Sequence, residues 1–319
     1  MRRSARIVAR VVAAVAVILA VCVVAGIFMA RSAWFRDKVR ERIISEIEKS
    51  TGGRAEIGKF RFDWARLTAT AAPLILHGRE ASADPPLVNI ASVTVGLRIV
   101  SMLERKVDLA YVRLDQPRVR VVFYADGSNN LPSPQIRPDW AGGLLNLAVR
   151  RYEIADGEVE YDNRRIPLNV RGENLRATAA YQARPAQYRV DLASRRVHLT
   201  GNGFAPVEVD TSAALTLERS RIEVSRLVLA SRQSRVELSG SIENLKSPRG
   251  NFSARASIAV RDAVDLFHAP LARVGSANFN GKISAAFLPA FNYSIDGHAT
   301  AQGIGFSQAR LKVEGARGS

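Results

Sequence analysis

The stretch "TLERSRIEVSRLVLASRQSRVELSG", residues 216–240, is the clearest guide to the fold of this chain. Ile222 and Val224 alternate with polar residues before residues 231–234, and Val236 and Leu238 do so after them. A period of two is that of a β-strand, because successive side chains point to opposite faces. The polar residues between the two runs are typical of a turn. The stretch therefore predicts two strands joined by a hairpin.

The same alternation extends through most of the chain in both directions. It begins at "RAEIGKFRFDW", residues 54–64, and returns in "PLVNIASVTVG", "KVDLAYVRLD" and "PVEVDTSAALTLE". Beyond residue 53, only residues 101–105 and 262–274 have a helical pattern, and no Pro- or Gly-rich linker divides the chain. We therefore expect a mostly β protein whose residues 54–319 form one extended, curled antiparallel sheet that adds strands by hairpins.

Alternation gives such a sheet one apolar and one polar face. The apolar face must pack on a second layer, close into a barrel, or curl into a groove that holds an apolar ligand. The sequence leaves a closed core and an open groove as alternatives. In the groove, the candidates to line it and contact lipid are Val119, Val121, Phe123, Val207, Val209, Leu215, Leu217, Ile222, Val224, Val236, Leu238 and Ile242.

The N-terminal residues predict a membrane anchor over residues 1–31. Residues 11–30 carry no charge, and twenty helical residues cover roughly the 30 Å of a bilayer core. Arg2, Arg3, Arg6 and Arg10 precede the stretch, which places the N-terminus in the cytoplasm and exports the remainder. The alternative is a signal peptide cleaved after Ala25, but the apolar run continues to residue 30 and favours a retained single-pass anchor.

Residues 32–53 predict an amphipathic helix next to the membrane. Phe35, Val39, Ile43 and Ile47 recur every four residues, and Gly52-Gly53 supplies a C-terminal stop. One apolar stripe can cover the open edge of a sheet, so we expect this helix to cap one end of the β region.

Motifs for catalysis are missing from the sequence. The four histidines do not have a metal-ligand spacing, and no nucleophile elbow, phosphate loop or dinucleotide fingerprint occurs. Asp156-Gly157 is interpreted as a hairpin turn, with Glu158 and Glu160 on the outward strand face. We expect no enzymatic activity, no cofactor, no catalytic residue and no metal.

The formal net charge of +16 favours acidic partners. Nucleic acid is disfavoured, because the basic residues are scattered along polar strand faces and an anchor precedes them. Arg118 and Arg120 alternate with Val119 and Val121, which is the pattern of an outward strand face rather than a phosphate site.

The order of several short motifs resembles the N-terminal part of the AsmA-like superfamily, which includes TamB-type proteins. These motifs are the Gly52-Gly53 lead into the first strand, "SMLERKVDLAYVRLDQP" at 101–117, the turn at 125–127 with Asn130-Leu131-Pro132, and "IADG" at 154–157. The resemblance covers most of the first 180 residues. It implies an inner-membrane anchor and a periplasmic β groove with an apolar interior.

The resemblance also implies a function in the cell envelope. Such proteins are implicated in moving phospholipid towards the outer membrane, so phospholipid or another acyl lipid is the expected ligand. The alternative is a scaffold for the assembly of outer-membrane proteins, since TamB-type members partner an outer-membrane barrel protein. The chain stops at "KVEGARGS" without a cap for its last strand, so we expect a truncated chain or a short member that needs a partner.

Overall fold

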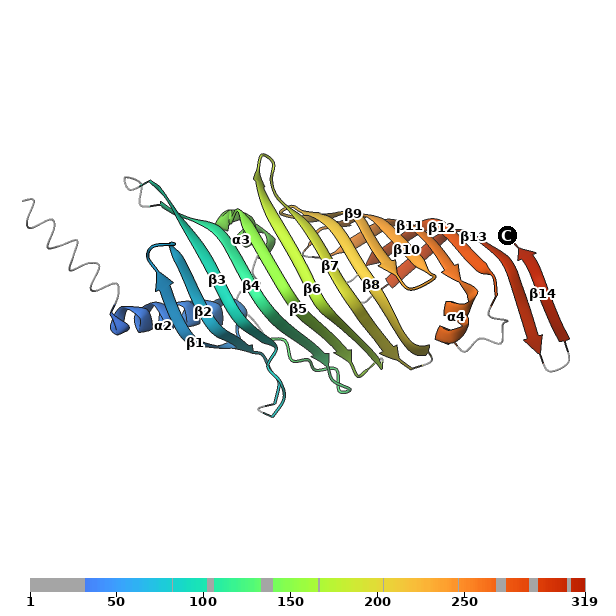
Figure 1. Cartoon of the computed structure of the whole chain (residues 1–319), viewed down its shortest axis with the longest axis horizontal. Helices are drawn as coiled ribbons and strands as arrows, with labels where there is room; N and C mark the ends of the chain where they lie inside the picture. The colour runs from blue at the N-terminus through green and yellow to red at the C-terminus, as the bar shows by residue number, and fades with distance from the viewer. Residues whose placement is uncertain are drawn as a thin grey trace, which may run out of the picture.

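The computed structural model describes residues 32–318 except 82, 102–105, 133–139, 166, 203, 246, 268–273, 287–291 and 309–310. The described part of the chain is mostly β, and its strands form one open 14-stranded sheet in which spatial order follows sequence order. The strands lie side by side along the long axis of the molecule (Figure 1). The predicted β class is therefore confirmed.

The elements have the following bounds: α2 (Ala33–Thr51), β1 (Arg54–Asp63), β2 (Thr68–His77), β3 (Val88–Ser101), β4 (Lys106–Phe123), α3 (Trp140–Leu147), β5 (Arg151–Asn163), β6 (Leu168–Ala183), β7 (Ala186–Gly201), β8 (Phe204–Leu217), β9 (Arg221–Ala230), β10 (Arg235–Glu243), β11 (Arg249–Ala259), α4 (Val260–Phe267), β12 (Ser276–Ala286), β13 (Asn292–Gln308) and β14 (Leu311–Gly318). The stretch 216–240 thus contains the end of β8, all of β9 and the start of β10, joined by tight turns.

Helix α2 forms where its sequence predicts and covers the edge strand β1. The side chain of Ser32 accepts a hydrogen bond from the Phe35 N–H, and Gly52 ends the helix in the left-handed conformation. The Glu48 carboxylate accepts a hydrogen bond from the Ala55 N–H, and Arg40 Nη1 donates to the Gly58 carbonyl oxygen. These side chains satisfy main-chain groups of β1 that would otherwise form an open edge.

The connection between β4 and β5 differs from the expected series of hairpins. These two strands are parallel, whereas every other neighbouring pair in the described sheet is antiparallel. Two parallel strands need a crossover, and the crossover here contains α3. The prediction of a purely antiparallel sheet was therefore wrong at this position, and helix α3 was not predicted.

A line of β-bulges runs across β4 to β7. Each of these strands has one residue in the left-handed region: Gln116 (φ 48°), Asp156 (φ 51°), Asn174 (φ 51°) and Arg196 (φ 58°). The pairing register shifts beside the last three of them. An extra residue moves all following side chains to the opposite face. All four strands carry such an extra residue at neighbouring positions, so their apolar side chains lie on the same face of the sheet before and after the bulges.

The bulges correct two interpretations of the sequence. Asp156-Gly157 is not a hairpin turn but lies inside β5, where Gly157 pairs with Leu175 of β6. Pro117 is likewise inside β4 rather than at a strand start, and it follows the bulged residue Gln116. Proline is tolerated in a strand next to a bulge, because the local ladder is already interrupted there.

The predicted anchor, residues 1–31, lies outside the described residues. Within the described part of the chain, no helix is both long enough and apolar enough to span a membrane. Most of the region expected to be helical at 101–105 is also outside the described residues, whereas α4 confirms a helix at the start of 262–274.

Candidate functional site

One face of the sheet is apolar from β1 to β13. The cross-strand register aligns one residue of each strand in a continuous row, formed by Phe62, Ala69, Val95, Val112, Tyr152, Ala179, Val190, Leu215, Val224, Gly240, Phe252, Ile283 and Ile295. A second row runs beside it through Phe60, Ala71, Val93, Leu114, Ile154, Ala177, Leu192, Ala213, Leu227, Leu238, Ala254, Gly281 and Gly297. Neither row contains a charged residue.

The structure places all twelve lining candidates on this apolar face. Val119 belongs to a row that reaches Val209, and Val121 belongs to a row that reaches Val207. Leu215 pairs with Val224 in the first row, and Leu238 lies in the second. The remaining candidates continue the same strand parities: Phe123, Leu217, Ile222, Val236 and Ile242. Whether these side chains contact lipid stays a prediction.

The apolar face is half-buried along most of its length. Leu192, Leu227 and Leu238 in the second row are all partly accessible, and so are Val190 and Leu215 in the first. Strand residues that face a sealed core are normally fully buried. The face is therefore a surface with open stretches rather than a closed interior.

Helix α3 covers the apolar face near one end of the strands. Its Ala141 and Leu145 form a buried cluster with Tyr188, at the start of β7, and Leu217, at the end of β8. Tyr181 and Tyr152 pack around Tyr188, with ring centroids 5.2 Å and 5.6 Å from it. This cluster is the main hydrophobic core among the described residues, and it occupies only one margin of the face.

Helix α4 covers the face near the opposite strand ends. It packs on β8 and β11, and its Val260 and Val264 are buried. A cavity of about 670 Å³ lies between α4 and the sheet. Its apolar lining comes mainly from Val207, Val209, Leu229, Val236 and Ile258.

Three of the twelve candidates thus meet in this cavity, namely Val207, Val209 and Val236. Val207 and Val209 come from β8 and Val236 from β10, whereas Leu229 and Ile258 were not among the candidates. Ile258 continues the alternation of β11, so the same periodicity could have found it. Leu229 follows a register shift in β9 and is out of phase with Ile222 and Val224, so only the strand pairing places it on this face. The polar mouth of the cavity includes Asp262 and Arg232.

A network of hydroxyl groups holds α4 in this position. The carboxylate of Asp262 accepts hydrogen bonds from the Ser231 and Ser234 hydroxyl groups, each over 2.6 Å. The Ser234 hydroxyl in turn accepts one from the Ala259 N–H. Both serines belong to the β9–β10 turn, so the hairpin recognised in the sequence positions the helix that forms the cavity.

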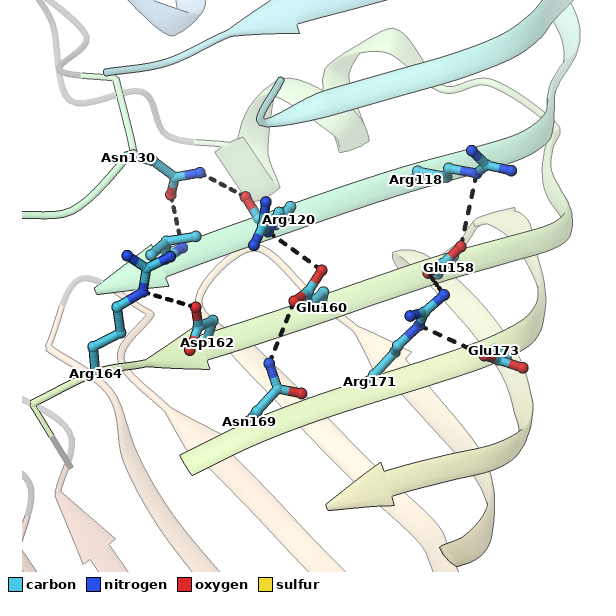
Figure 2. Close-up of polar contacts among 11 residues, drawn as sticks. Arg118, Arg120, Asn130, Glu158, Glu160, Asp162, Arg164, Asn169, Arg171 and Glu173 are labelled. Atoms are coloured by element: carbon cyan, nitrogen blue, oxygen red, sulfur yellow. Dashed lines mark hydrogen bonds and ion pairs between the residues drawn. The ribbon is translucent and has the colours of Figure 1, made fainter. Parts of the chain in front are cut away.

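The opposite face of the sheet carries a charge ladder across β4 to β6. Glu158 lies between Arg118 and Arg171, with N–O distances of 3.7 Å and 2.6 Å, and Arg171 also faces Glu173 at 3.5 Å. Figure 2 shows that these side chains line up across adjacent strands. Such exposed pairs contribute little free energy each. The pair with Glu158 gives the Arg118 guanidinium group a partner within the sheet, which agrees with its predicted place on the outward strand face.

A second ion pair beside this ladder engages Arg120, so neither arginine of residues 118–120 forms a phosphate site. Arg120 Nε lies 3.3 Å from Glu160, and Glu160 also accepts a hydrogen bond from the Asn169 side chain (Figure 2). The loop that follows β4 is structural, because the buried Asn130 accepts from the Val122 N–H and donates to the Arg120 carbonyl oxygen. Arg118, Arg120 and Asn130 are therefore all engaged in contacts within the sheet and its loop.

Histidine side chains are not brought together into a metal site. His77 Nδ1 lies 3.1 Å from Glu80, and that carboxylate also accepts main-chain hydrogen bonds from Gly78 and Leu87. His198 lies 3.9 Å from Glu208 on the neighbouring strand. In the parts of the chain that the structure describes, no cluster of three or more potential metal ligands occurs.

No protein-family model matches the chain, and no curated protein matches its sequence. The similarity to AsmA-like proteins therefore stays a prediction that rests on the short motifs.

Proposed function

We propose that this protein is a membrane-anchored lipid conduit of the cell envelope, in which the apolar face of the sheet forms a groove for acyl chains. The anchor at residues 1–31 holds it in the inner membrane with its N-terminus in the cytoplasm and the sheet in the periplasm. The ligand in this proposal is a phospholipid or another acyl lipid. No catalysis is required of such a protein, because the groove only shields the hydrocarbon from water.

The observation that supports the proposal most strongly is the uninterrupted apolar row from Phe62 to Ile295. Burial of apolar area stabilises a hydrocarbon chain by about 25 cal/mol per Å², wherever along the row the chain lies. A series of equivalent positions lets a lipid move without crossing a charged barrier. A single binding pocket would not need thirteen successive strands.

Helices α3 and α4 fit this proposal as walls on either margin of the face. They cover opposite strand ends and leave the row through Leu192 and Leu227 partly open between them. Large exposed apolar surfaces are rare on soluble proteins and mark places where an apolar partner binds. The partly open rows are therefore the expected path of the lipid.

Site-specific photocrosslinking tests the proposal directly. A photoreactive amino acid replaces Leu192 or Leu227 on the apolar face, and matched controls replace Asp191 or Arg226, their neighbours on the polar face. In cells fed radiolabelled phosphate, we expect phospholipid adducts at the two leucine positions and none at the controls. Equal labelling of both faces, or no labelling at either leucine, would overturn the conduit.

The same cells distinguish the scaffold function. A scaffold for outer-membrane proteins predicts that the crosslinked product at Leu192 and Leu227 is a polypeptide rather than a lipid. Mass spectrometry of the adducts separates these outcomes.

A further inference from the structure

We propose that the end of the molecule formed by the start of α2 and the β1–β2 turn docks on the surface of a bilayer that contains anionic lipid. This surface comprises Trp34 and Phe35 of α2 together with Phe62 and Trp64 at the end of β1 and in the turn. The inference rests on the proposed function for the anchored topology, and it adds a second, peripheral contact with the membrane.

Two hydrogen bonds fix how α2 runs along β1. Glu48 bonds to the Ala55 N–H, and Arg40 bonds to the Gly58 carbonyl oxygen, so the helix runs antiparallel to the strand. From Arg40 back to Trp34 the helix rises about 9 Å. From Gly58 the strand covers about 13 Å to reach Phe62, and the turn follows. The start of α2 and the β1–β2 turn therefore lie towards the same end of the molecule, as Figure 1 also shows.

The aromatic side chains at this end are unusually exposed. Trp34 is 66% exposed, Trp64 42% and Phe35 37%, whereas Val39, Ile43 and Ile47 of the same α2 stripe are partly buried. The ring of Trp64 stacks edge-on against Phe62, with centroids 4.5 Å apart, and this contact holds it in place. Tryptophan prefers the interface between lipid headgroups and hydrocarbon, because its ring is apolar while its N–H is polar.

The charges around these rings favour an anionic surface. Arg61 and Lys59 are exposed on β1 and have no ion pair with any described residue, and Arg66 in the turn lies 4.0 Å from Asp63. Cations next to a membrane gain about 1 kcal/mol each from anionic headgroups. Aromatic side chains bordered by cations are the composition of a membrane-docking surface rather than of a protein interface core, which is depleted in charge.

The position in the chain identifies the bilayer as the occupant. Trp34 follows the uncharged stretch of residues 11–30 by four residues, so the start of α2 cannot be far from the membrane if that stretch spans it. Trp64 is thirty residues further along, and only the antiparallel path of α2 and β1 brings it back to the same end. Docking of both tryptophans would present β1, the first strand of the apolar face, to the lipid leaflet.

Fluorescence quenching in the full-length protein tests the proposal. Its three tryptophans are Trp34, Trp64 and Trp140, and the last begins α3, which packs on β7. Single-tryptophan variants, with the other two changed to Phe, are reconstituted in vesicles that contain phosphatidylglycerol and a phospholipid brominated near its carbonyl end. We expect strong quenching of Trp34 and Trp64 and weak quenching of Trp140.

Trp64 decides the outcome. If Trp64 is quenched no more than Trp140, the turn does not touch the bilayer and the proposal fails, which includes the case in which a protein partner covers this end in the cell. If Trp140 is quenched as strongly as Trp64, the quencher is lipid bound on the apolar face and the docking proposal also fails. That second result would not contradict the proposed lipid-conduit function, so the conduit proposal and the docking proposal can be told apart.

Charge variants provide an independent measurement. In the variant Arg61→Gln with Arg66→Gln, we expect the phosphatidylglycerol dependence of Trp64 quenching to weaken by about fivefold for each arginine removed, with Trp34 unaffected. The matched control is Arg189→Gln with Arg255→Gln, which changes two exposed arginines on β7 and β11. An equal loss in the control would show a general charge effect and overturn the docking surface.

Discussion

The hydroxyl group of Tyr188 donates a hydrogen bond to the main-chain carbonyl oxygen of Val149, 3.0 Å away, and the two residues are 1% and 0% exposed. Val149 lies at the end of the β4–β5 crossover and Tyr188 in β7, so this bond ties the crossover to the apolar face. The carbonyl oxygen of Leu144 in α3 lies 3.2 Å from the same hydroxyl group. A buried carbonyl group without a partner is costly, so Tyr188 holds α3 on the sheet.

The variant Tyr188→Phe should therefore lower the free energy of unfolding by about 2 kcal/mol, because it leaves a buried carbonyl group unsatisfied while preserving the ring packing. Chemical denaturation in detergent, followed by circular dichroism, measures this loss. The matched control is Tyr124→Phe, which keeps the ring that lies beneath the Arg164 guanidinium group at 5.3 Å. An equal effect in both variants would show that the Tyr188 hydroxyl group has no special role.

The same residue predicts how stability changes at alkaline pH. Burial raises the pKa of Tyr188 well above its ordinary value of 10.0, and burial also raises the pKa of Tyr152. Above pH 10 the unfolded chain loses these protons while the folded chain keeps them, so stability falls as pH rises from that point. Thermal unfolding between pH 8 and 11 should show this decline, and Tyr188→Phe should make it less steep. A variant with an unchanged slope would contradict the assignment.

A charge placed on the apolar face should have different effects under α3 and in the open rows. Leu217→Arg buries a charge in the cluster with Ala141 and Leu145, and we expect a loss of roughly 3 kcal/mol or more. Leu227→Arg lies in a partly open row, where the side chain can extend its charge to water, and we expect a folded protein.

The lipid readout of these variants comes from a photoreactive residue at Leu238, which pairs with Leu227. Crosslinking to lipid should fall sharply in Leu227→Arg while circular dichroism stays unchanged. If Leu227→Arg unfolds the protein as completely as Leu217→Arg, the apolar face is a closed core and the conduit is excluded.

The attachment of α4 should depend on the two serines of the β9–β10 turn. The double variant Ser231→Ala with Ser234→Ala removes both hydroxyl donors to Asp262, and we expect a loss of about 2 to 4 kcal/mol in the stability of the α4 contact, since each bond involves a charged acceptor. Hydrogen–deuterium exchange of α4 should quicken accordingly. Ser225→Ala, an exposed serine on β9, is the control and should leave the exchange unchanged.

Asn130 should be important for stability although it lies in a loop. Its side chain accepts from the Val122 N–H over 2.9 Å and donates to the Arg120 carbonyl oxygen over 2.7 Å, and the residue is buried. Asn130→Ala should cost about 1 to 3 kcal/mol, because both main-chain groups lose their partner. Asn129→Ala is the comparison, since that side chain accepts a hydrogen bond from the exposed Leu131 N–H and forms no other hydrogen bond among the described residues, and it should cost less. The order of the two melting temperatures tests the assignment.

Much of the fold followed from local pattern. The apolar stripe of α2 and its glycine stop predicted a helix over residues 32–53, and the observed helix spans Ala33–Thr51, because both signals act within one or two turns. The hairpin at 216–240 was predicted equally well, since both strands and their turn are adjacent in sequence. The lining candidates from β8 to β10 fell on one face for the same reason.

Helix α3 could not be predicted in the same way. Its sequence "WAGGLLNL" contains two glycines, which have low helix propensity, and an eight-residue helix is too short to be stable alone. It forms because Ala141 and Leu145 are buried against Tyr188 and Leu217, which come from strands further along the chain. Tertiary packing therefore outweighs the local preference.

The sequence by itself determined that the chain alternates, that one sheet face is apolar and that a helix precedes the first strand, because each of these depends on neighbouring residues. Only the tertiary structure decided which residues share that face across β4 to β7. The bulges at Gln116, Asp156, Asn174 and Arg196 shift the parity of each strand, and their alignment depends on pairing between strands. A one-residue insertion reverses the face on which each later side chain lies, so the period of two cannot predict a common face on both sides of it. The continuous apolar rows therefore exist only in the folded sheet.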